Sequence, residues 1–324
     1  EQRFADSGVK DMVRRALLPW YNAFSFLRTY AGIDNWSPDK GQLLGDNILD
    51  QWLRSRLQTL KSNVATEMEA YRLYNVVPEL FGFIEDLTNW YIRLNRGRFW
   101  GEDITPDKVA AYSTLYDVLL ELSKLMAPFA PFLSEHLYQQ LETLADRPAS
   151  PSSVHLCDYP LPEADLIQPT LETAVDRMQQ VILLGRQKRE EVKIGLRTPL
   201  ARLTIINGDA TLLREMQSLE AYLCDELNVL AIQYSSDESA YIDLQARPNF
   251  PLLGKRLGKR MKAFSGQIGQ LSQAHIARLQ REGSLTLEAD GQTEVFSAEE
   301  IEIKQQSKPG TNTLSNSQIS IDLD

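Results

Sequence analysis

Apolar side chains recur at intervals of three and four residues through most of the first half of the chain, which is the spacing of amphipathic helices. The clearest stripe is Val77, Leu80, Phe81, Ile84, Leu87, Tyr91 and Leu94. Such a stripe buries one face of a helix and leaves the other face in water. The same periodicity predicts further helices over residues 9–31, 47–64, 106–126 and 132–144.

Polar residues and prolines mark the ends of these predicted helices. Asp46 is the predicted N-cap of the second helix, and Thr105 is the predicted N-cap of the fourth. Pro131 opens the fifth helix, and Pro78 lies in the first turn of the third helix or at a kink within it. Because the connections between these long helices are short, the sequence predicts an antiparallel helical bundle over residues 1–160.

The pattern becomes mixed after a proline-rich linker that includes Arg147, Pro160 and Pro169. The predicted elements are a helix over 171–189, a strand over 201–206, a helix over 210–227, a strand over 229–234, a helix over 258–281 and a hairpin over 284–296 around Asp290-Gly291. The first strand, helix and second strand form a βαβ pattern. The sequence therefore predicts a mainly α protein, with a smaller α+β domain over residues 161–324.

The composition is that of a globular protein, with 43% hydrophobic and 24% charged residues. The sequence has no apolar run of about 18 residues, the length that a membrane-spanning helix needs. Cys157 and Cys224 are far apart, and His136, His155 and His275 are isolated from one another. We therefore expect reduced thiols, no metal site and a cytoplasmic location.

Charge is distributed unevenly along the chain. The formal net charge of −10 argues against nucleic-acid binding if it is taken alone. However, basic side chains gather in residues 186–197 and again in residues 247–262, where no acid interrupts them, while the last forty or so residues are acidic. Segregation of this kind favours the oriented docking of a polyanion.

No catalytic motif is found. The sequence contains no glycine-rich phosphate loop, no nucleophile elbow and no metal-binding signature. Pairs such as Glu190 with Glu191 are adjacent, so on a helix their side chains point about 100° apart and cannot share a substrate. We expect neither a catalytic residue nor a cofactor in this chain.

The most informative segment is Asn89-Trp-Tyr-Ile-Arg-Leu-Asn-Arg-Gly-Arg-Phe-Trp. Asn89, Arg93 and Arg96 recur at helical spacing on one face, and Trp90 and Trp100 flank the arginines. Arginine forks bind phosphates or guanine edges, and aromatic rings stack on unpaired bases. The alternative is a helix C-terminus enriched in cations, which suits the helix dipole.

Two other groups of residues contain cations on predicted helices. Trp52, Arg54 and Arg56 form either a base-stacking face or a solvated helix edge. Arg14 and Arg15 are interpreted as solvated surface residues.

Several strings, in the same order along the chain, resemble the anticodon-binding domain and the following junction domain of isoleucyl-tRNA synthetases. These strings are Leu17-Leu-Pro-Trp-Tyr-Asn-Ala-Phe-Ser-Phe, Asp50-Gln-Trp-Leu-Arg-Ser-Arg-Leu, residues 89–100, Met126-Ala-Pro-Phe-Ala-Pro-Phe-Leu-Ser-Glu, Lys193-Ile-Gly-Leu-Arg-Thr-Pro-Leu, and Pro248-Asn-Phe with Leu253-Gly-Lys. The last pair resembles the longer, eukaryote-like form of these enzymes. The two ATP-site signatures of the family, an editing domain and a terminal zinc cluster are absent, so the resemblance implies a non-catalytic fragment or a separately encoded domain.

The resemblance implies that the chain holds the anticodon arm of isoleucine tRNA, while missing catalytic and editing domains would use ATP and magnesium to attach isoleucine. The predicted tRNA-binding residues are Trp52, Arg54, Arg56, Asn89, Trp90, Arg93, Arg96, Arg98, Trp100, Arg186, Lys188, Arg189, Arg197, Lys255, Arg256, Lys259 and Lys262. Two alternatives remain open, a protein-interaction module of a synthetase complex and the equivalent fragment of a valyl-tRNA synthetase.

Overall fold

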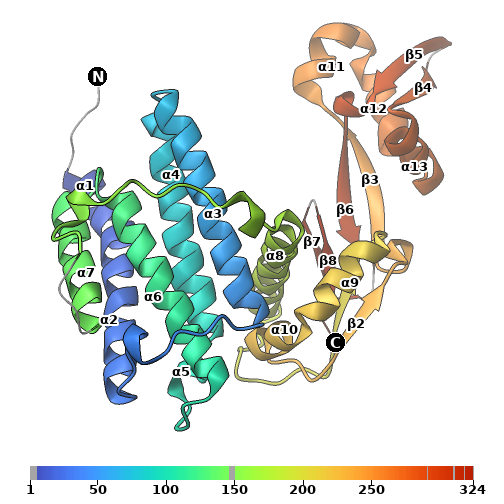
Figure 1. The fold of residues 1–324 in the computed structure, drawn as a ribbon. Coiled ribbons are helices and arrows are strands. Elements are labelled where there is room, and N and C mark those ends of the chain that lie inside the picture. Colours follow the sequence, from blue (N-terminus) through green and yellow to red (C-terminus); the bar gives the residue numbers. More distant parts are fainter. Residues whose placement is uncertain (1–5, 146–149, 290, 309–310, 317, 324) are drawn as a thin grey trace. The chain divides into compact units, whose positions relative to one another are not determined.

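The computed structural model describes residues 6–145, 150–289, 291–308, 311–316 and 318–323 (Figure 1). Part of the predicted linker, with Arg147, and the hairpin residue Asp290 lie outside these ranges. Contacts divide the chain into two compact units, Glu1–Thr173 and Ala174–Asp324. This division falls slightly later than the predicted boundary at residue 160.

The first unit is a helical bundle. Its main helices are α1 (Asp6–Met12), α2 (Leu18–Ile33), α3 (Ile48–Glu69), α4 (Leu73–Glu85), α5 (Arg96–Trp100), α6 (Pro106–Met126) and α7 (Pro131–Leu144). The long helices lie alongside one another, with α6 packed against α2, α3 and α7 (Figure 1). Short 3₁₀ turns are η2 (Pro38–Lys40), η4 (Val154–Leu156) and η5 (Ala164–Leu166). The predicted bundle is confirmed.

The helix ends follow local chemistry in most places. The Thr105 hydroxyl accepts a hydrogen bond from the Lys108 amide at 3.1 Å, as predicted for an N-cap. The predicted cap Asp46 is wrong by one residue, because Asn47 Oδ1 accepts from the Leu49 amide at 2.9 Å. Pro78 lies inside α4 rather than in its first turn.

Two π-helical segments interrupt the regular helices of the bundle. Residues Val13–Leu17 form η1 between α1 and α2, and residues Asp86–Ile92 form η3 after α4. A π turn holds more residues than an α turn, and such turns are frequent at functional sites. The predicted core stripe nevertheless continues through η3, because Leu87 and Tyr91 are fully buried.

The core of the bundle contains many large aromatic side chains. Its fully buried members include Trp20, Phe24, Trp52, Phe83, Tyr91, Phe99, Tyr112, Tyr116 and Tyr138. Several are contributed by segments far apart in sequence, and Phe99 of α5 meets Tyr112 of α6 edge-on at 5.3 Å between ring centroids. Aromatic packing of this kind fixes the short helix α5 against the bundle.

The second unit contains a four-stranded sheet in the order β2-β1-β8-β7. Strands β1 (Leu203–Ile206) and β2 (Ile232–Ser235) are parallel, and β8 (Ser320–Leu323) lies antiparallel to β1 and to β7 (Thr313–Ser315). The predicted βαβ pattern is confirmed, although its helix consists of α9 (Ala210–Ser218) and α10 (Glu220–Leu227). The long helix α8 (Pro169–Glu191) precedes β1.

The rest of the second unit is a smaller layer built on two antiparallel pairs, β3 (Ile242–Pro248) with β6 (Ile301–Ser307) and β4 (Ser284–Ala289) with β5 (Gln292–Ser297). Its helices are α11 (Phe250–Leu257), α12 (Met261–Gly269) and α13 (Gln273–Glu282), with 3₁₀ turns η6 (Glu238–Ala240), η7 (Gly258–Arg260) and η8 (Ala298–Glu300). They enclose a core that includes Leu253, Phe264, Ile268, Leu279 and Phe296. The predicted hairpin is confirmed. The single helix predicted over 258–281 is wrong, because residues 258–260 form η7 and residues 270–272 separate α12 from α13. No helix among the described residues is long and apolar enough to cross a membrane.

Gly45 allows a close approach between the loop before α3 and helix α6. A Cβ added at Gly45 would lie 2.7 Å from Cβ of Ala110, which is buried. We expect Gly45→Ala to lower the free energy of unfolding by about 1–3 kcal/mol, because backbone must move to relieve the overlap. Urea denaturation measures the change.

Gly82→Ala is the matched control, because a Cβ at Gly82 in α4 meets nothing within 4 Å. This substitution should stabilise the bundle by about 0.5–1 kcal/mol, as alanine does in a helix interior. Adding Ala110→Gly to Gly45→Ala should cost less than the sum of the two single changes. Equal stability of the Gly45 and Gly82 variants would show that the contact is not tight.

Candidate nucleic-acid interface

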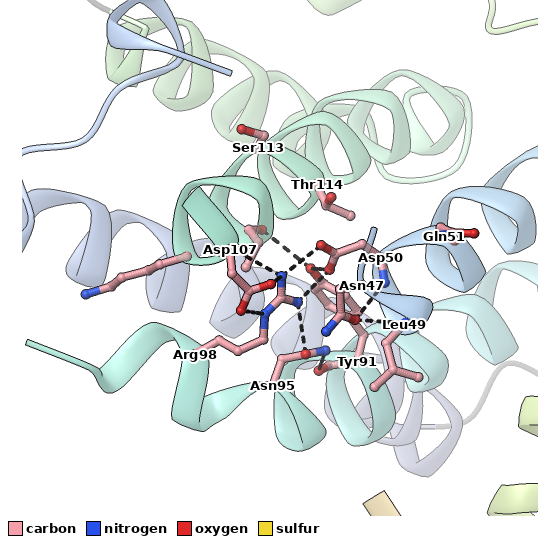
Figure 2. Close-up of polar contacts among 12 residues, drawn as sticks. Asn47, Leu49, Asp50, Gln51, Tyr91, Asn95, Arg98, Asp107, Ser113 and Thr114 are labelled. Atoms are coloured by element: carbon pink, nitrogen blue, oxygen red, sulfur yellow. Dashed lines mark hydrogen bonds and ion pairs between the residues drawn. The ribbon is translucent and has the colours of Figure 1, made fainter. Parts of the chain in front are cut away.

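Arg98 of α5 lies at the centre of a network of polar contacts (Figure 2). Its Nη1 and Nη2 donate to the two carboxylate oxygens of Asp50 at 2.8 and 2.9 Å. Its Nε and Nη2 donate to the carboxylate of Asp107 at 2.8 and 2.6 Å, and Nη1 also donates to Asn95 Oδ1 at 3.0 Å. The guanidinium thus ties α5 to the starts of α3 and α6.

The carboxylate of Asp50 is fully buried and needs these donors. The Tyr91 phenol also donates to Asp50 Oδ1 at 2.7 Å. Burial, together with the Asp50 carboxylate, raises the pKa of Tyr91 well above its ordinary value, so the phenol stays a donor. Burial alone would lower the pKa of Arg98, but the hydrogen bonds to Asp50 and Asp107 raise it above its ordinary value.

The structure assigns Arg98 to the bundle itself, which corrects its prediction as a tRNA contact. Its guanidinium is occupied by two carboxylates. Only Asp107 of these partners is exposed. A nucleic acid would have to displace a buried ion pair to bind this arginine, which is unfavourable.

The predicted group on α3 is also corrected. The Trp52 side chain is 0% exposed, so it packs in the core and cannot stack on a base. Arg54 Nη2 donates to Thr114 Oγ1 at 2.6 Å. Arg56 bonds to Asp86 at 3.2 Å and to Glu172 at 3.3 Å, and these carboxylates raise the pKa of Arg56 against the opposing effect of burial.

The exposed part of the predicted interface lies on η3 and α5. Asn89 and Arg96 are exposed, Trp90 and Arg93 are half-buried, and Trp100 is 56% exposed. The guanidinium carbon of Arg96 lies 6.0 Å from the centroid of the Trp100 ring, in a cation–π contact. Arg96 and Trp100 therefore offer a charged and an aromatic surface side by side.

The structure also brings together residues that the sequence interpretation left as solvated surface. Arg14 and Arg15 of η1 line one surface depression with Thr88 and Asn89 of η3. These two segments are more than seventy residues apart in sequence. In the sequence, this depression is indicated only by the two adjacent arginines. Their adjacency does not reveal that η3 forms the other side of the depression.

In the second unit, the first basic cluster is mostly engaged within the fold. Arg186 pairs with Glu226, and Lys188 lies 3.6 Å from Glu191. Arg189 is 2% exposed, so it is a buried side chain rather than a surface contact. Only Arg197 of this predicted group is exposed.

Buried Arg189 organises the loop that carries Arg197. Its Nη1 donates to the carbonyl oxygens of Gly195 and Thr198 at 3.1 and 3.0 Å. Its Nη2 donates to the carbonyl oxygens of Leu227 and Asn228 at 2.7 and 3.0 Å. Burial lowers the pKa of Arg189 from its ordinary value. One guanidinium thereby closes the loop after α8 against the end of α10.

The second basic cluster, in residues 247–262, likewise contains both a paired cation and unpaired ones. Arg256 contacts Glu300 at 3.0 Å and lies 5.0 Å from the centroid of the Phe296 ring, so it braces β5. Lys255, Lys259 and Lys262 are exposed, and the described residues give them no ion-pair partner. These three lysines remain available to a polyanion.

The described residues offer no group of three or more His, Cys, Asp and Glu side chains that could hold a metal ion. Cys157 and Cys224 are half-buried and are free thiols.

Comparisons with known proteins identify the family. A family model described as the anticodon-binding domain of tRNA ligase matches residues 50–205. The chain is 43% identical over 326 residues to isoleucine–tRNA ligase of Bdellovibrio bacteriovorus, and this alignment covers 100% of the chain. It is 41% identical over 88% of its length to the cytoplasmic isoleucine–tRNA ligase of Mus musculus, and 37% identical over 87% to that of Saccharomyces cerevisiae. The chain belongs to the isoleucine–tRNA ligase family and matches the C-terminal region of its members.

The match covers only part of each isoleucine–tRNA ligase. The chain spans 30% of the Bdellovibrio ligase, 24% of the mouse ligase and 28% of the yeast ligase. The matched residues include η3, α5 and nearly all of α3; Asp50 lies in α3, and Arg96 and Arg98 lie in α5.

Arg98→Met tests whether this arginine supports the anticodon-binding domain. The substitution leaves the buried Asp50 carboxylate without its cation, so we expect the free energy of unfolding to fall by about 3–5 kcal/mol. Arg96→Met, an exposed cation on the same helix, should change it by about 0.5 kcal/mol or less. Denaturant titration followed by circular dichroism compares the two, and similar small effects would contradict the structural role.

Arg189→Met tests the loop of this ligase region that carries Arg197. Four backbone carbonyls lose their charged donor, and each buried acceptor left unpaired costs about 1–3 kcal/mol. Amide hydrogen exchange over residues 192–200 and 227–229 should therefore become at least about 10-fold faster. Arg197→Met, on the exposed side of the loop, should leave these rates unchanged. Unchanged exchange in the Arg189 variant would exclude the closure by Arg189.

Proposed function

We propose that this chain binds the anticodon arm of isoleucine tRNA. The match of residues 50–205 to the anticodon-binding domain of tRNA ligases supports this function. The observation that carries the proposal is the exposed pair of Arg96 and Trp100 on α5, within that domain.

The chemistry of this pair suits an unpaired base. Bases of an anticodon loop expose their Watson–Crick edges and their faces. The Trp100 ring would stack on a base face, while the Arg96 fork would bond to a base edge or a phosphate. Asn89 and Trp90 of η3, together with Arg93 directly after it, would complete the surface. Arg98 would act indirectly, by holding α5 in place.

The second unit would contribute phosphate contacts. Arg197, Lys255, Lys259 and Lys262 are exposed cations, and flexible lysines suit the sugar–phosphate backbone. Such contacts position a nucleic acid without reading its sequence. Their effect should be the same for every tRNA and should weaken with salt.

The longer protein would attach isoleucine to this tRNA with ATP and magnesium, in the cytoplasm. The names of the bacterial, mouse and yeast relatives support this part of the proposal. The chain would serve as the tRNA-holding part of that protein, because its sequence lacks the two ATP-site signatures of the family.

Arg96→Ala and Trp100→Ala test the proposed recognition. Each should weaken binding of isoleucine tRNA by about 10- to 100-fold, since a paired arginine–base contact or a stacked ring contributes about 1–3 kcal/mol. Binding of a non-cognate tRNA should change little. Fluorescence anisotropy with labelled tRNAs gives both affinities. Arg278→Ala is the control, because Arg278 is an exposed cation of the second unit that pairs with Glu282.

Other outcomes distinguish the alternatives. Equal losses for both tRNAs would indicate phosphate contacts alone. If valine tRNA binds more tightly than isoleucine tRNA in direct competition, the isoleucine assignment is wrong. Absence of salt-dependent tRNA binding would favour a protein-interaction module, a class that the net charge of −10 also suits.

A further inference from the structure

A surface depression of the helical bundle, distinct from the surface that carries Arg96 and Trp100, is lined by residues of both π-helical segments. Residues of η1 and η3, with neighbouring residues of α2 and α4, line a surface depression of about 270 Å³. The lining side chains are Arg14, Arg15, Pro19, Phe81, Glu85, Thr88 and Asn89. The depression is thus built from two parts of the chain that the fold brings together.

The two arginines are available for a ligand. Both side chains are exposed, and within the described part of the chain neither forms an ion pair or a hydrogen bond. Arg56 and Arg98, by contrast, are each held by two carboxylates. Among the described residues, Glu85 is the only acid that lines the depression, so two arginines face one carboxylate there.

The π turn explains why adjacent arginines share one site. In an α-helix, consecutive side chains point about 100° apart. A π turn contains more residues, so the angle between consecutive side chains is smaller. Both Arg14 and Arg15 therefore reach the same depression, although they are neighbours in sequence.

Neutral groups add to the site. Thr88 donates its hydroxyl to the Ile84 carbonyl at 2.8 Å, so it has no proton left for a ligand. The exposed amide of Asn89 can still donate. Phe81 and Pro19 supply an apolar wall beside these polar groups. Two guanidinium forks and an amide beside an apolar wall match a phosphate attached to a sugar.

We propose that this depression binds a backbone phosphodiester of the tRNA, with Arg14, Arg15 and Asn89 as the donors. The proposal rests on the tRNA binding proposed above. Asn89 connects the two surfaces, because it lines the depression and belongs to the segment that carries Arg96 and Trp100. An acidic peptide is the less favoured ligand, since Asn89 belongs to the same segment as the exposed Trp100, which suits a base better than a carboxylate.

The double variant Arg14→Gln/Arg15→Gln tests the site. Both residues are exposed, so the fold should be retained. Affinity for isoleucine tRNA should fall about 10-fold, and non-cognate tRNA should lose affinity to the same extent. The slope of log affinity against log salt should become shallower by about one, because the two arginines together neutralise one phosphate.

The matched control is Arg28→Gln/Lys40→Gln, which removes two exposed positive charges from α2 and η2 of the same unit. It lowers the net charge equally, so any general electrostatic effect is common to both variants. Affinity and salt slope should be close to those of the unmodified protein. Equal losses in the two double variants would overturn the site.

Phosphate-ethylation interference identifies the group that is bound. One tRNA phosphate whose ethylation blocks binding of the unmodified protein should lose this effect in the Arg14/Arg15 variant. It should keep the effect in Arg96→Gln. If the unmodified protein binds tRNA and the interference pattern is the same in the Arg14/Arg15 variant, the phosphodiester site is wrong while the proposed function stands. If the unmodified protein binds no tRNA, both are wrong.

Two further probes separate other sources of negative charge. A site for free phosphate would let inorganic phosphate raise the melting temperature of the unmodified protein but not of the Arg14/Arg15 variant, with tRNA affinity unchanged. A peptide site would bind polyglutamate in an Arg14- and Arg15-dependent manner, again with tRNA affinity unchanged. Either result would overturn the assignment to the RNA backbone.

Discussion

The helical bundle depends on one buried carboxylate. Asp50 has no contact with solvent, so its charge must be compensated inside the fold by Arg98 and by the Tyr91 phenol. These donors come from η3 and α5, and Asp107 of α6 holds the other side of the same guanidinium. A misplaced α5 would leave a buried charge unpaired, which is far more costly than a poor apolar contact. The position of Arg96 and Trp100 at the surface follows from this requirement.

Those features of the fold that depend on neighbouring residues were predictable from the sequence. The apolar stripes, the Thr105 cap and the prolines at 106 and 131 act within one or two helical turns, and the structure confirms the elements they predict. The π segments were missed because an apolar stripe alone does not reveal a change of period. Strands β3, β6, β7 and β8 were missed because each is specified by a partner strand, and β3 pairs with a strand more than fifty residues later.

The candidate site also depends on residues that are distant in sequence, and these could not be predicted. Arg96 and Arg98 are two residues apart and chemically identical, yet one is exposed and the other pairs with an aspartate 48 residues earlier. Arg189 likewise looks like part of a basic run, although it donates to four carbonyl oxygens, two of them at a distant helix end. Which cations of a run are available is therefore decided by partners that periodicity cannot identify. The family resemblance predicted the domain, and the three-dimensional contacts are needed to select its surface.

Arg189 and Arg197 belong to one short segment but would respond differently to their surroundings. The partners of Arg189 are neutral carbonyls in a buried site, where dissolved ions screen interactions only weakly. Arg197 is exposed, so its attraction to any polyanion falls as ionic strength rises. The loop should therefore keep its shape in salt that releases a bound nucleic acid. A nucleic acid bound as proposed would then meet the loop in the same conformation after dilution, and rebinding would require no refolding step.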